Sequence, residues 1–377
     1  MSAHAQKWSF RITPVRVLMI LIAALAAAIV VYRLIFGLGA VSNLNDQWPW
    51  GLWIGFDVLC GVALAGGGYG TALIVHILHI EKFSSIGRSA MLSSMLGYIL
   101  VLIGLFLDIG QWFNFWRPFV SWGYHSVLFE VFWCVSLYTT VQVIEFGEIA
   151  TERVGKKWHS FFKKILPVLL VIGVLLPTLH QSSLGGLYLT EVGKLHPIWW
   201  SPYIPVFFLM SSFFVGPAMV CVETALSGWA FKHKADLKVL RGLAKIGAVI
   251  MLLYTILKIV DFTSRDVWPY IFAGGLEGNM FLLEITLGVL IPLIIVFSPF
   301  GKTRKGLVTY GALTAIGLVI NRLNVVITGM VNYYGPGYVP AWTEIVVTVG
   351  LVCGGILVYC FIVENFNIVQ HDEESPA

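Results

Sequence analysis

Long continuous apolar segments dominate this chain, and they constrain its fold more than any other feature. A helix needs about 20 apolar residues to cross the hydrocarbon core of a bilayer. A strand of a membrane β-barrel would instead alternate apolar and polar residues over about ten positions. The sequence therefore predicts an all-α integral membrane protein with about ten transmembrane helices, arranged as two four-helix bundles plus two extra helices. The predicted spans of this single transmembrane domain (1–377) are 15–36, 51–79, 89–113, 123–148, 163–181, 203–230, 243–264, 278–298, 307–331 and 341–364.

The charge content excludes several classes of protein. Charged residues make up 12% of the chain and hydrophobic residues 58%, whereas a soluble domain carries about 25% charged residues. A cytosolic enzyme, a nucleic-acid binder and a disordered scaffold are therefore excluded. The net charge of +4 reflects basic residues in short loops and does not indicate a nucleic-acid partner.

The basic residues also predict the orientation, because lysine and arginine concentrate in cytoplasmic loops. They cluster before the first span and in the second, fourth, sixth and eighth loops. Both termini, including an acidic tail over 365–377, are therefore predicted in the cytoplasm, with the chain in the cell inner membrane. The opposite loops carry few basic residues, namely Arg33, Arg117, Lys194 and Arg265.

The predicted outer loops are rich in tryptophan, tyrosine and proline, notably around Trp48, Trp116 and Trp199. Aromatic residues at span ends commonly form an interfacial belt. With 14 tryptophans in the chain, a docking surface for a partner protein is the second interpretation. The two interpretations stay open here.

Ionisable residues within membrane spans are expensive, so each one is a functional hypothesis. Lys258 and Asp261 stand three apart and predict an intrahelical ion pair, and Arg322 could neutralise Glu284 or Glu344. Glu145 and Glu148 are interpreted as solvated near the cytoplasmic interface. Glu130 and Glu223 have no basic neighbour at helical spacing, which favours proton transfer. The full set is Asp57, Asp108, Glu130, Glu145, Glu148, Glu223, Lys258, Asp261, Glu284, Arg322 and Glu344.

Histidine and cysteine patterns do not favour a metal centre. A b-type haem needs two facing imidazoles, and only His125 and His180 fall on one predicted side, whereas His76 and His79 fall on the other. The five cysteines are single and form no ligand-spaced pair. We therefore expect no metal site, haem or iron–sulfur cluster in this chain. The glycines at 66–68 and 70 are interpreted as sites of close helix packing.

Five segments carry a resemblance to a known family. They are WPWGLWIGFDVLCGVALAGGG at 48–68, LDIGQWFNFWRP at 107–118, YHSVLFE at 124–130, LPTLHQSSLGGL at 176–187 and PAWTEIVVTVG at 340–350. Together they resemble the NrfD/PsrC family of integral membrane subunits, in its ten-span HybB-like branch, close to the HmcC and DsrP membrane subunits. The resemblance runs along nearly the whole chain.

The resemblance implies a quinone-reactive membrane anchor of a multi-subunit oxidoreductase, which is not an autonomous enzyme. A ferredoxin-like iron–sulfur partner in the periplasm would exchange electrons with a (mena)quinone near the outer surface. Further redox subunits would be a hydrogenase, a multihaem cytochrome or a heterodisulfide-reductase-like module. The proton path implied by the family comprises Arg88, Glu223, Tyr98 and Glu130.

Quinone reduction takes two electrons and two protons, so its site needs hydrogen-bonding groups and a proton source. The polar residues expected at the outer ends of spans two, four and five supply them: Asp57, His125, His180, Gln181 and Ser182. A secondary transporter is the alternative from another class, although no convincing inverted repeat supports it. A b-haem cytochrome subunit is the third hypothesis.

Overall fold

The computed structural model describes residues 8–78, 80–154, 156–232, 236–335, 337–366 and 368. These residues contain helices and no strand, and ten helical segments are long and apolar enough to cross a membrane. The predicted all-α, multi-pass architecture is confirmed. The ten candidate spans are Pro14–Phe36, Trp53–Val75, Gly87–Asp108, Val127–Glu152, Trp158–Thr190, Ile204–Phe231, Leu237–Ser264, Leu276–Phe297, Arg304–Tyr334 and Trp342–Asn365.

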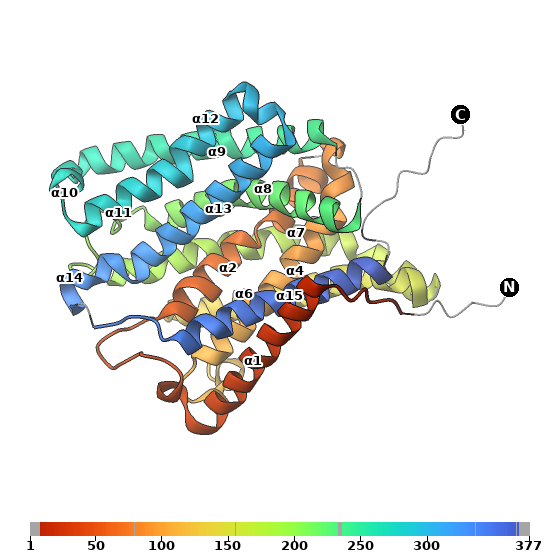
Figure 1. The fold of residues 1–377 in the computed structure, drawn as a ribbon, viewed down its shortest axis with the longest axis horizontal. Coiled ribbons are helices and arrows are strands. Elements are labelled where there is room, and N and C mark those ends of the chain that lie inside the picture. Colours follow the sequence, from red (N-terminus) through yellow and green to blue (C-terminus); the bar gives the residue numbers. More distant parts are fainter. Residues whose placement is uncertain are drawn as a thin grey trace.

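The spans form two packed groups around a shared central helix, α8 (Ile204–Phe231). We call spans two to five the first half: α2 (Leu59–Leu64) with α3 (Gly67–Ala72), α4 (Gly87–Asp108), α6 (Val127–Val154) and α7 (Lys156–Leu187). We call spans six to nine the second half: α8, α9 (Leu237–Ser264), α11 (Leu276–Ile285) with α12 (Ile291–Phe297), and α13 (Arg304–Val326). Helix α8 packs against α7 on one side and against α9 and α13 on the other (Figure 1).

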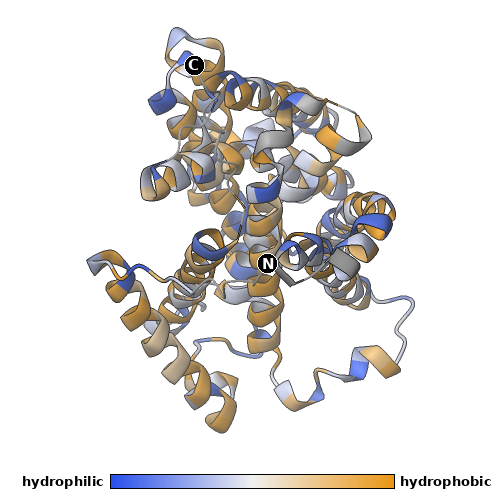
Figure 2. Cartoon of the chain, turned by 90° about the vertical axis from the view of Figure 1, so that its right-hand side faces the viewer, coloured by the Kyte–Doolittle hydropathy of each residue, from blue (hydrophilic) through white to orange (hydrophobic). Residues whose placement is uncertain are grey.

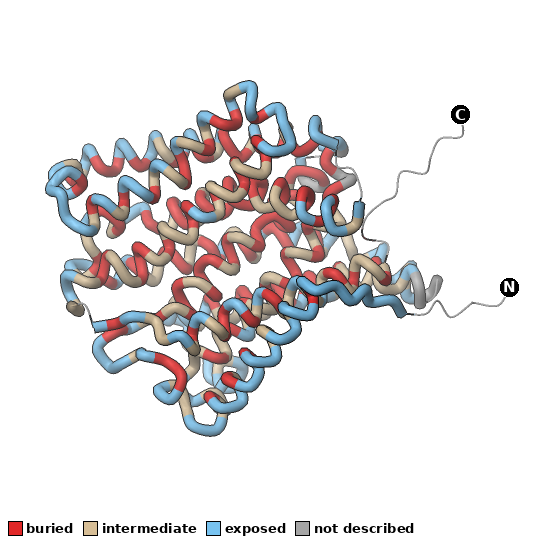
Figure 3. The backbone as a smooth tube through the Cα atoms, in the orientation of Figure 1, coloured by how far each residue is buried: buried red, intermediate tan, exposed pale blue. Residues whose placement is uncertain are grey.

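Two further helices, α1 (Pro14–Phe36) and α15 (Trp342–Asn365), pack on each other, and α15 also packs on α4. Figure 2 looks along the helices and shows apolar residues on their outward faces. In Figure 3 the buried positions concentrate in the centre of the bundle and the exposed positions on its rim. Apolar side chains exposed on outward faces are what lipid contact requires.

The N-terminal segment is fastened to the end of α15. The Ser9 amide donates to Asn365 Oδ1 at 2.9 Å, and Asn365 Nδ2 returns a bond to the Ser9 carbonyl at 2.7 Å. Arg16 pairs with Glu364 at 2.7 Å, and the Trp8 ring stacks on Phe361 at 5.7 Å. We call this arrangement the clasp and this side of the molecule the clasp end. The opposite side, with the short helices α10 (Trp268–Phe272) and α14 (Val331–Tyr334), is the loop end (Figure 1).

Span two is not a regular helix. Two π-helical segments, Trp53–Val58 and Leu73–Ile77, flank α2 and α3, which are separated by a turn at Ala65 and Gly66. A Cβ at Gly68 would lie 2.3 Å from the Ser94 Cβ of α4, and one at Gly67 would lie 2.9 Å from the Val220 side chain of α8. The expected close packing is thus confirmed for the glycine run, while a Cβ at Gly70 would meet open space.

Two sequence predictions fall outside the described residues. They concern the acidic tail around Asp372, Glu373 and Glu374, and also His79.

Candidate functional site

The fully buried polar side chains of the first half include three that make no hydrogen bond of normal length with the described residues, although Tyr98 and Gln181 lie near enough to interact. The three are His180 and Gln181 on α7 and Tyr98 on α4. The Tyr98 ring meets the His180 ring edge-on at 5.6 Å between centroids. An unsatisfied buried polar group costs free energy, so these groups have hydrogen-bonding capacity that the described residues do not use.

A line of polar aromatic groups continues from Tyr98 toward the clasp end. The Tyr98 ring lies 4.5 Å from Tyr138 of α6, and the Tyr138 ring lies 6.5 Å from Tyr69 of α3. Gln142 Nε2 donates to Tyr138 Oη at 3.0 Å and to Ser94 Oγ at 2.7 Å. Hydroxyl and amide groups in contact can pass or orient protons, which apolar side chains cannot.

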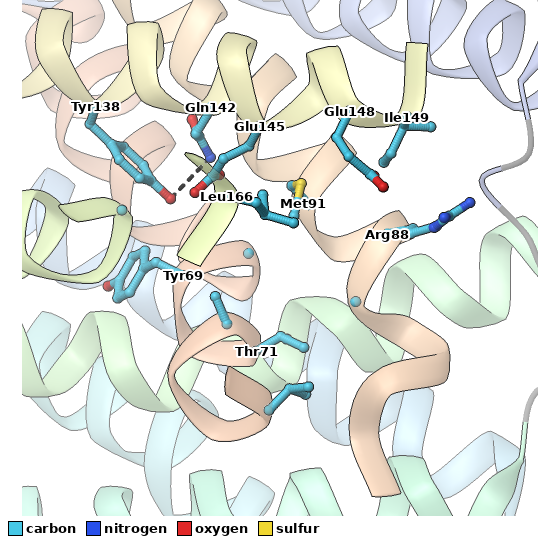
Figure 4. Close-up of a pocket in the computed structure, with 15 residues that line it drawn as sticks. Tyr69, Thr71, Arg88, Met91, Tyr138, Gln142, Glu145, Glu148, Ile149 and Leu166 are labelled. Atoms are coloured by element: carbon cyan, nitrogen blue, oxygen red, sulfur yellow. Dashed lines mark hydrogen bonds between the residues drawn. The ribbon is translucent and has the colours of Figure 1, made fainter. Parts of the chain in front are cut away.

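A cavity of about 260 Å³ adjoins this line of residues. Figure 4 shows Tyr138, Gln142 and Glu145 projecting from one helix into the cavity opposite Tyr69, and Glu148 of the same helix on the side of Arg88. The lining of the cavity is mainly apolar but includes a row of polar side chains, and the cavity is large enough for several water molecules, since one water needs only about 10–15 Å³ of such space. It therefore connects the buried tyrosines with the clasp end.

Glu145 is the most informative residue of this cavity. Its exposed fraction is 6%, so the interpretation of a carboxylate solvated at the interface is wrong for this residue. Glu145, together with Tyr138, Gln142 and Tyr69, is absent from the site predicted from the sequence. Positions 138, 142 and 145 recur at helical spacing on α6, and this periodicity was the available signal.

Arg88 and Glu223 lie at the clasp end in different surroundings. Arg88 pairs with Glu152 at 2.7 Å beside the cavity mouth. Glu223 of α8 is half-buried and accepts bonds from Ser89 Oγ at 2.5 Å and Tyr359 Oη at 3.1 Å. Glu223 thus faces α4 and α15, and it is not among the residues that line the cavity.

Glu130, His125 and Ser182 lie toward the loop end. Glu130 is exposed and accepts a bond from Ser183 Oγ at 2.6 Å. His125 is exposed in the turn before α6, and Ser182 is half-buried. Because His180 is fully buried, the structure does not bring His125 and His180 into one buried pocket.

Asp57 belongs to a separate buried group between span two, α4 and α15. Its carboxylate accepts a bond from Thr348 at 2.9 Å and lies against Gly104. His180 meets α4 at Tyr98, about 9 Å along the helix from Gly104 at a rise of about 1.5 Å per residue. The structure therefore does not place Asp57 beside His180.

A buried carboxylate close to Asp57 fixes the loop that leads into α15. Glu344 accepts bonds from Tyr338 Oη at 2.7 Å and from the Ala341 amide at 2.8 Å. Burial raises the pKa of Tyr338, so this phenol stays protonated and keeps donating. This group has the features of a structural anchor.

The second half contains its own buried charges, and they pair differently from the prediction. Lys258 lies 3.8 Å from Glu284 of α11, and Asp261 pairs with Arg265 at 2.6 Å. The predicted Lys258–Asp261 pair is wrong. Lys258 pairs with Glu284 on another helix, and Asp261 pairs with Arg265, which directly follows α9. Sequence spacing within one helix cannot reveal such a partner.

The tryptophans expected on the outer face divide into two kinds. Trp48 and Trp199 are buried, and Trp199 Nε1 donates to Glu284 at 2.9 Å. Trp116 is 50% exposed. Trp48 and Trp199 therefore support the loops from within, and of the three only Trp116 is available to a partner or to the membrane interface.

The described residues hold no cluster of three or more histidine, cysteine or carboxylate side chains suited to a metal ion. The five cysteines are all buried and free. No histidine of the site is therefore assigned to a metal.

Comparisons with known proteins agree on one family. The family model described as "Polysulphide reductase, NrfD" matches residues 40–333. A protein of Nitratidesulfovibrio vulgaris is 36% identical over 99% of both chains. The probable Ni/Fe-hydrogenase 2 b-type cytochrome subunit of Escherichia coli is 31% identical, covering 90% of this chain and 88% of its own. The menaquinone reductase integral membrane subunit of N. vulgaris is 29% identical, covering 82% and 80%.

Proposed function

The chain belongs to the NrfD family, and on this premise we propose that it is the quinone-reactive membrane subunit of a multi-subunit oxidoreductase. The expected family resemblance is confirmed. One relative is named as a menaquinone reductase subunit and another as a hydrogenase subunit. These names support a subunit that exchanges electrons with menaquinone or a similar quinone within a larger complex.

The observation that carries the proposal is the buried group of Tyr98, His180 and Gln181, in which neither ring nitrogen of His180 makes a hydrogen bond with the described residues. A quinone presents two carbonyl oxygens that accept hydrogen bonds, and its reduced form presents two hydroxyls that donate them. An imidazole and an amide each supply both a donor and an acceptor. These three residues can therefore hold and orient either form of the quinone in a buried site.

The proton route that the structure supports best differs in part from the sequence prediction. Arg88 and Tyr98 stay on it, but Glu145, Gln142 and Tyr138 connect them along the cavity. Glu223 faces Ser89 and Tyr359, so it is at most a second branch at the same end. Glu130 lies at the loop end, where it accepts a hydrogen bond from Ser183. There its carboxylate can exchange protons with the water on that side of the membrane.

Electrons must reach the quinone from another subunit, because the cysteines of this chain are single and buried. We assign this role to a ferredoxin-like iron–sulfur subunit that docks at the loop end. The clasp end would then face the cytoplasm, as the basic loops indicate, and the loop end the periplasm of a bacterial inner membrane. Protons drawn from the cytoplasm to a site near the periplasm make turnover electrogenic. Each unit charge that crosses a membrane potential of 100 mV changes the free energy of turnover by about 2.3 kcal/mol.

The test replaces His180 by alanine in the assembled complex. Quinone-linked turnover should fall by about 100-fold or more, as for loss of a group that binds and exchanges protons. Reduction of an artificial acceptor by the partner subunits should be unchanged. His125→Ala is the matched control, because His125 is exposed, and it should retain turnover. Normal quinone turnover in a well-assembled His180→Ala complex would remove His180 from the site.

One relative carries the name b-type cytochrome, which keeps a haem subunit as the second candidate function. The absence of haem from this chain stays a prediction. A visible absorption spectrum of the purified subunit checks it, since a bound b-type haem would give reducible bands that a quinone does not.

A further inference from the structure

The buried charges of the second half do not cancel. Glu284 accepts bonds from the Asn321 and Asn324 amides at 2.8 and 3.0 Å and from Trp199, and it lies beside Lys258. Its single negative charge therefore serves two cations, Lys258 directly at 3.8 Å and Arg322 only through the bridging Asn321. Asp261 and Arg265 neutralise each other.

Arg322 of α13 is the cation that remains. It is fully buried, and no carboxylate of the described residues lies within ion-pair distance of it. Its guanidinium donates to neutral oxygens, Asn321 Oδ1 at 2.6 Å and Ser211 Oγ at 2.7 Å, and lies 3.6 Å above the Phe208 ring. Its Nε has no partner among the described residues. A buried charge without a counter-charge is costly, so its retention calls for a reason.

The position of Arg322 suggests that reason. Helix α13 packs on α8 and on span two, at the boundary of the two halves. There the Arg322 guanidinium lies over the Phe208 ring, which is 5.9 Å between centroids from the Tyr188 ring at the end of span five. Tyr69 bonds to Ser212 at 2.7 Å, next to the Ser211 that holds Arg322. Arg322 and Tyr69 are therefore held by adjacent serines of α8, and Tyr69 belongs to the line of tyrosines that leads to His180.

We propose that Arg322 is a positioning residue that supplies a fixed positive charge to the quinone site of the first half. The inference rests on the proposed function. Reduction adds two electrons and two protons to the quinone, with electrons from the partner subunit and protons from the cavity. When electrons arrive ahead of protons, the ring carries negative charge, and a permanent cation nearby stabilises it. Arginine suits this role because it stays protonated in proteins.

Paired quinone analogues test the charge directly. The anionic 2-hydroxy-1,4-naphthoquinone and the neutral 2-methyl-1,4-naphthoquinone are titrated into the assembled complex, with quenching of tryptophan fluorescence as the readout. Arg322→Met should weaken binding of the anion by about tenfold, as expected for one unit charge roughly 10 Å away at an effective dielectric of about 20. Binding of the neutral analogue should stay within about twofold. Arg322→Lys should restore most of the difference.

A second variant keeps Arg322 in place, which guards against misfolding of Arg322→Met. Ser211→Asp puts a carboxylate beside the guanidinium and should reproduce the selective loss of anion binding, whereas the size-matched Ser211→Asn should bind both analogues as the wild type does. Equal binding of the anion by wild type, Arg322→Met and Ser211→Asp would overturn this inference alone. Failure of the wild type to bind either analogue, or full turnover of His180→Ala, would overturn the proposed function instead.

Discussion

At the scale of single residues, one face of α6 supplies the polar groups on which the proposed proton route depends. Tyr138, Gln142 and Glu145 follow one another at about one helical turn, and all three line the cavity. Glu145 is the only carboxylate of these three, so it is the one that can change charge as a proton passes. Gln142 keeps Tyr138 oriented through its bond at 3.0 Å.

We therefore expect Glu145→Gln to slow quinone turnover by about 10-fold to 100-fold, the range of a lost general acid–base group. Glutamine keeps the size of the side chain but cannot bind and release a proton as a carboxylate does. Assembly should be unchanged, as measured by co-purification of the partner subunits. The measurement is quinone-linked turnover in membrane vesicles with and without an imposed potential.

Glu152→Gln serves as the control, because Glu152 pairs with Arg88 at the clasp end and its side chain is 30% exposed. It should change turnover by less than about threefold. Glu130→Gln distinguishes the route through the cavity and Glu145 from the route through Glu130 that the sequence predicts. If Glu130→Gln abolishes the dependence on potential while Glu145→Gln behaves as the wild type, the cavity is not the proton route.

At the scale of helices, the second half depends on the close approach of two glycines. Gly288 lies in the π-helical segment Thr286–Leu290, which joins α11 to α12, and it faces Gly317 of α13. A Cβ at Gly317 would lie 2.0 Å from the Gly288 Cα. Since backbone atoms cannot move aside as a flexible side chain can, the two helices would have to separate.

Gly317→Ala is therefore expected to destabilise the subunit by roughly 1–3 kcal/mol, as overpacking of a core does. The loss should appear as a lower midpoint of thermal unfolding in detergent and a lower yield of assembled complex. Gly354→Ala on α15 is the control, because a Cβ there meets nothing within 4 Å. An unchanged midpoint for Gly317→Ala would show that α12 and α13 separate without cost.

At the scale of the whole molecule, the length of the apolar runs was enough to predict the architecture, because hydrocarbon thickness leaves few alternatives. Partners across helices were not predictable. Lys258 forms an ion pair with Glu284 of α11, and Trp199 donates a hydrogen bond to the same carboxylate. Such pairings depend on the rotational orientation of each helix about its axis. Where a helix is similarly apolar on all faces, its sequence alone does not determine that orientation.

Orientation in the membrane is the prediction that belongs to this scale. The native cysteines are buried, so single cysteines added at exposed positions can be labelled selectively. A membrane-impermeant thiol reagent should label Ser121→Cys at the loop end in intact spheroplasts. Lys302→Cys, at the start of α13, should react only after lysis; both positions are exposed. The reverse pattern would place the clasp end in the periplasm and contradict the proposed source of protons.

The clasp has a consequence for how the protein is made. Helix α1 precedes the other nine spans in the chain and α15 follows them, yet these two helices pack on each other and are tied by Ser9, Arg16, Glu364 and Asn365. Synthesis proceeds from the N-terminus, so α1 enters the bilayer long before its neighbour exists. Until α15 follows, the end of α1 can bond to the end of α4 and the segment after it, through Arg33 to Leu107 and Trp112 to Leu34, but the face that packs on α15 stays in lipid. Packing of α1 against α15 is thus a late event, and a ribosome that stops before α15 leaves that face of α1 uncovered.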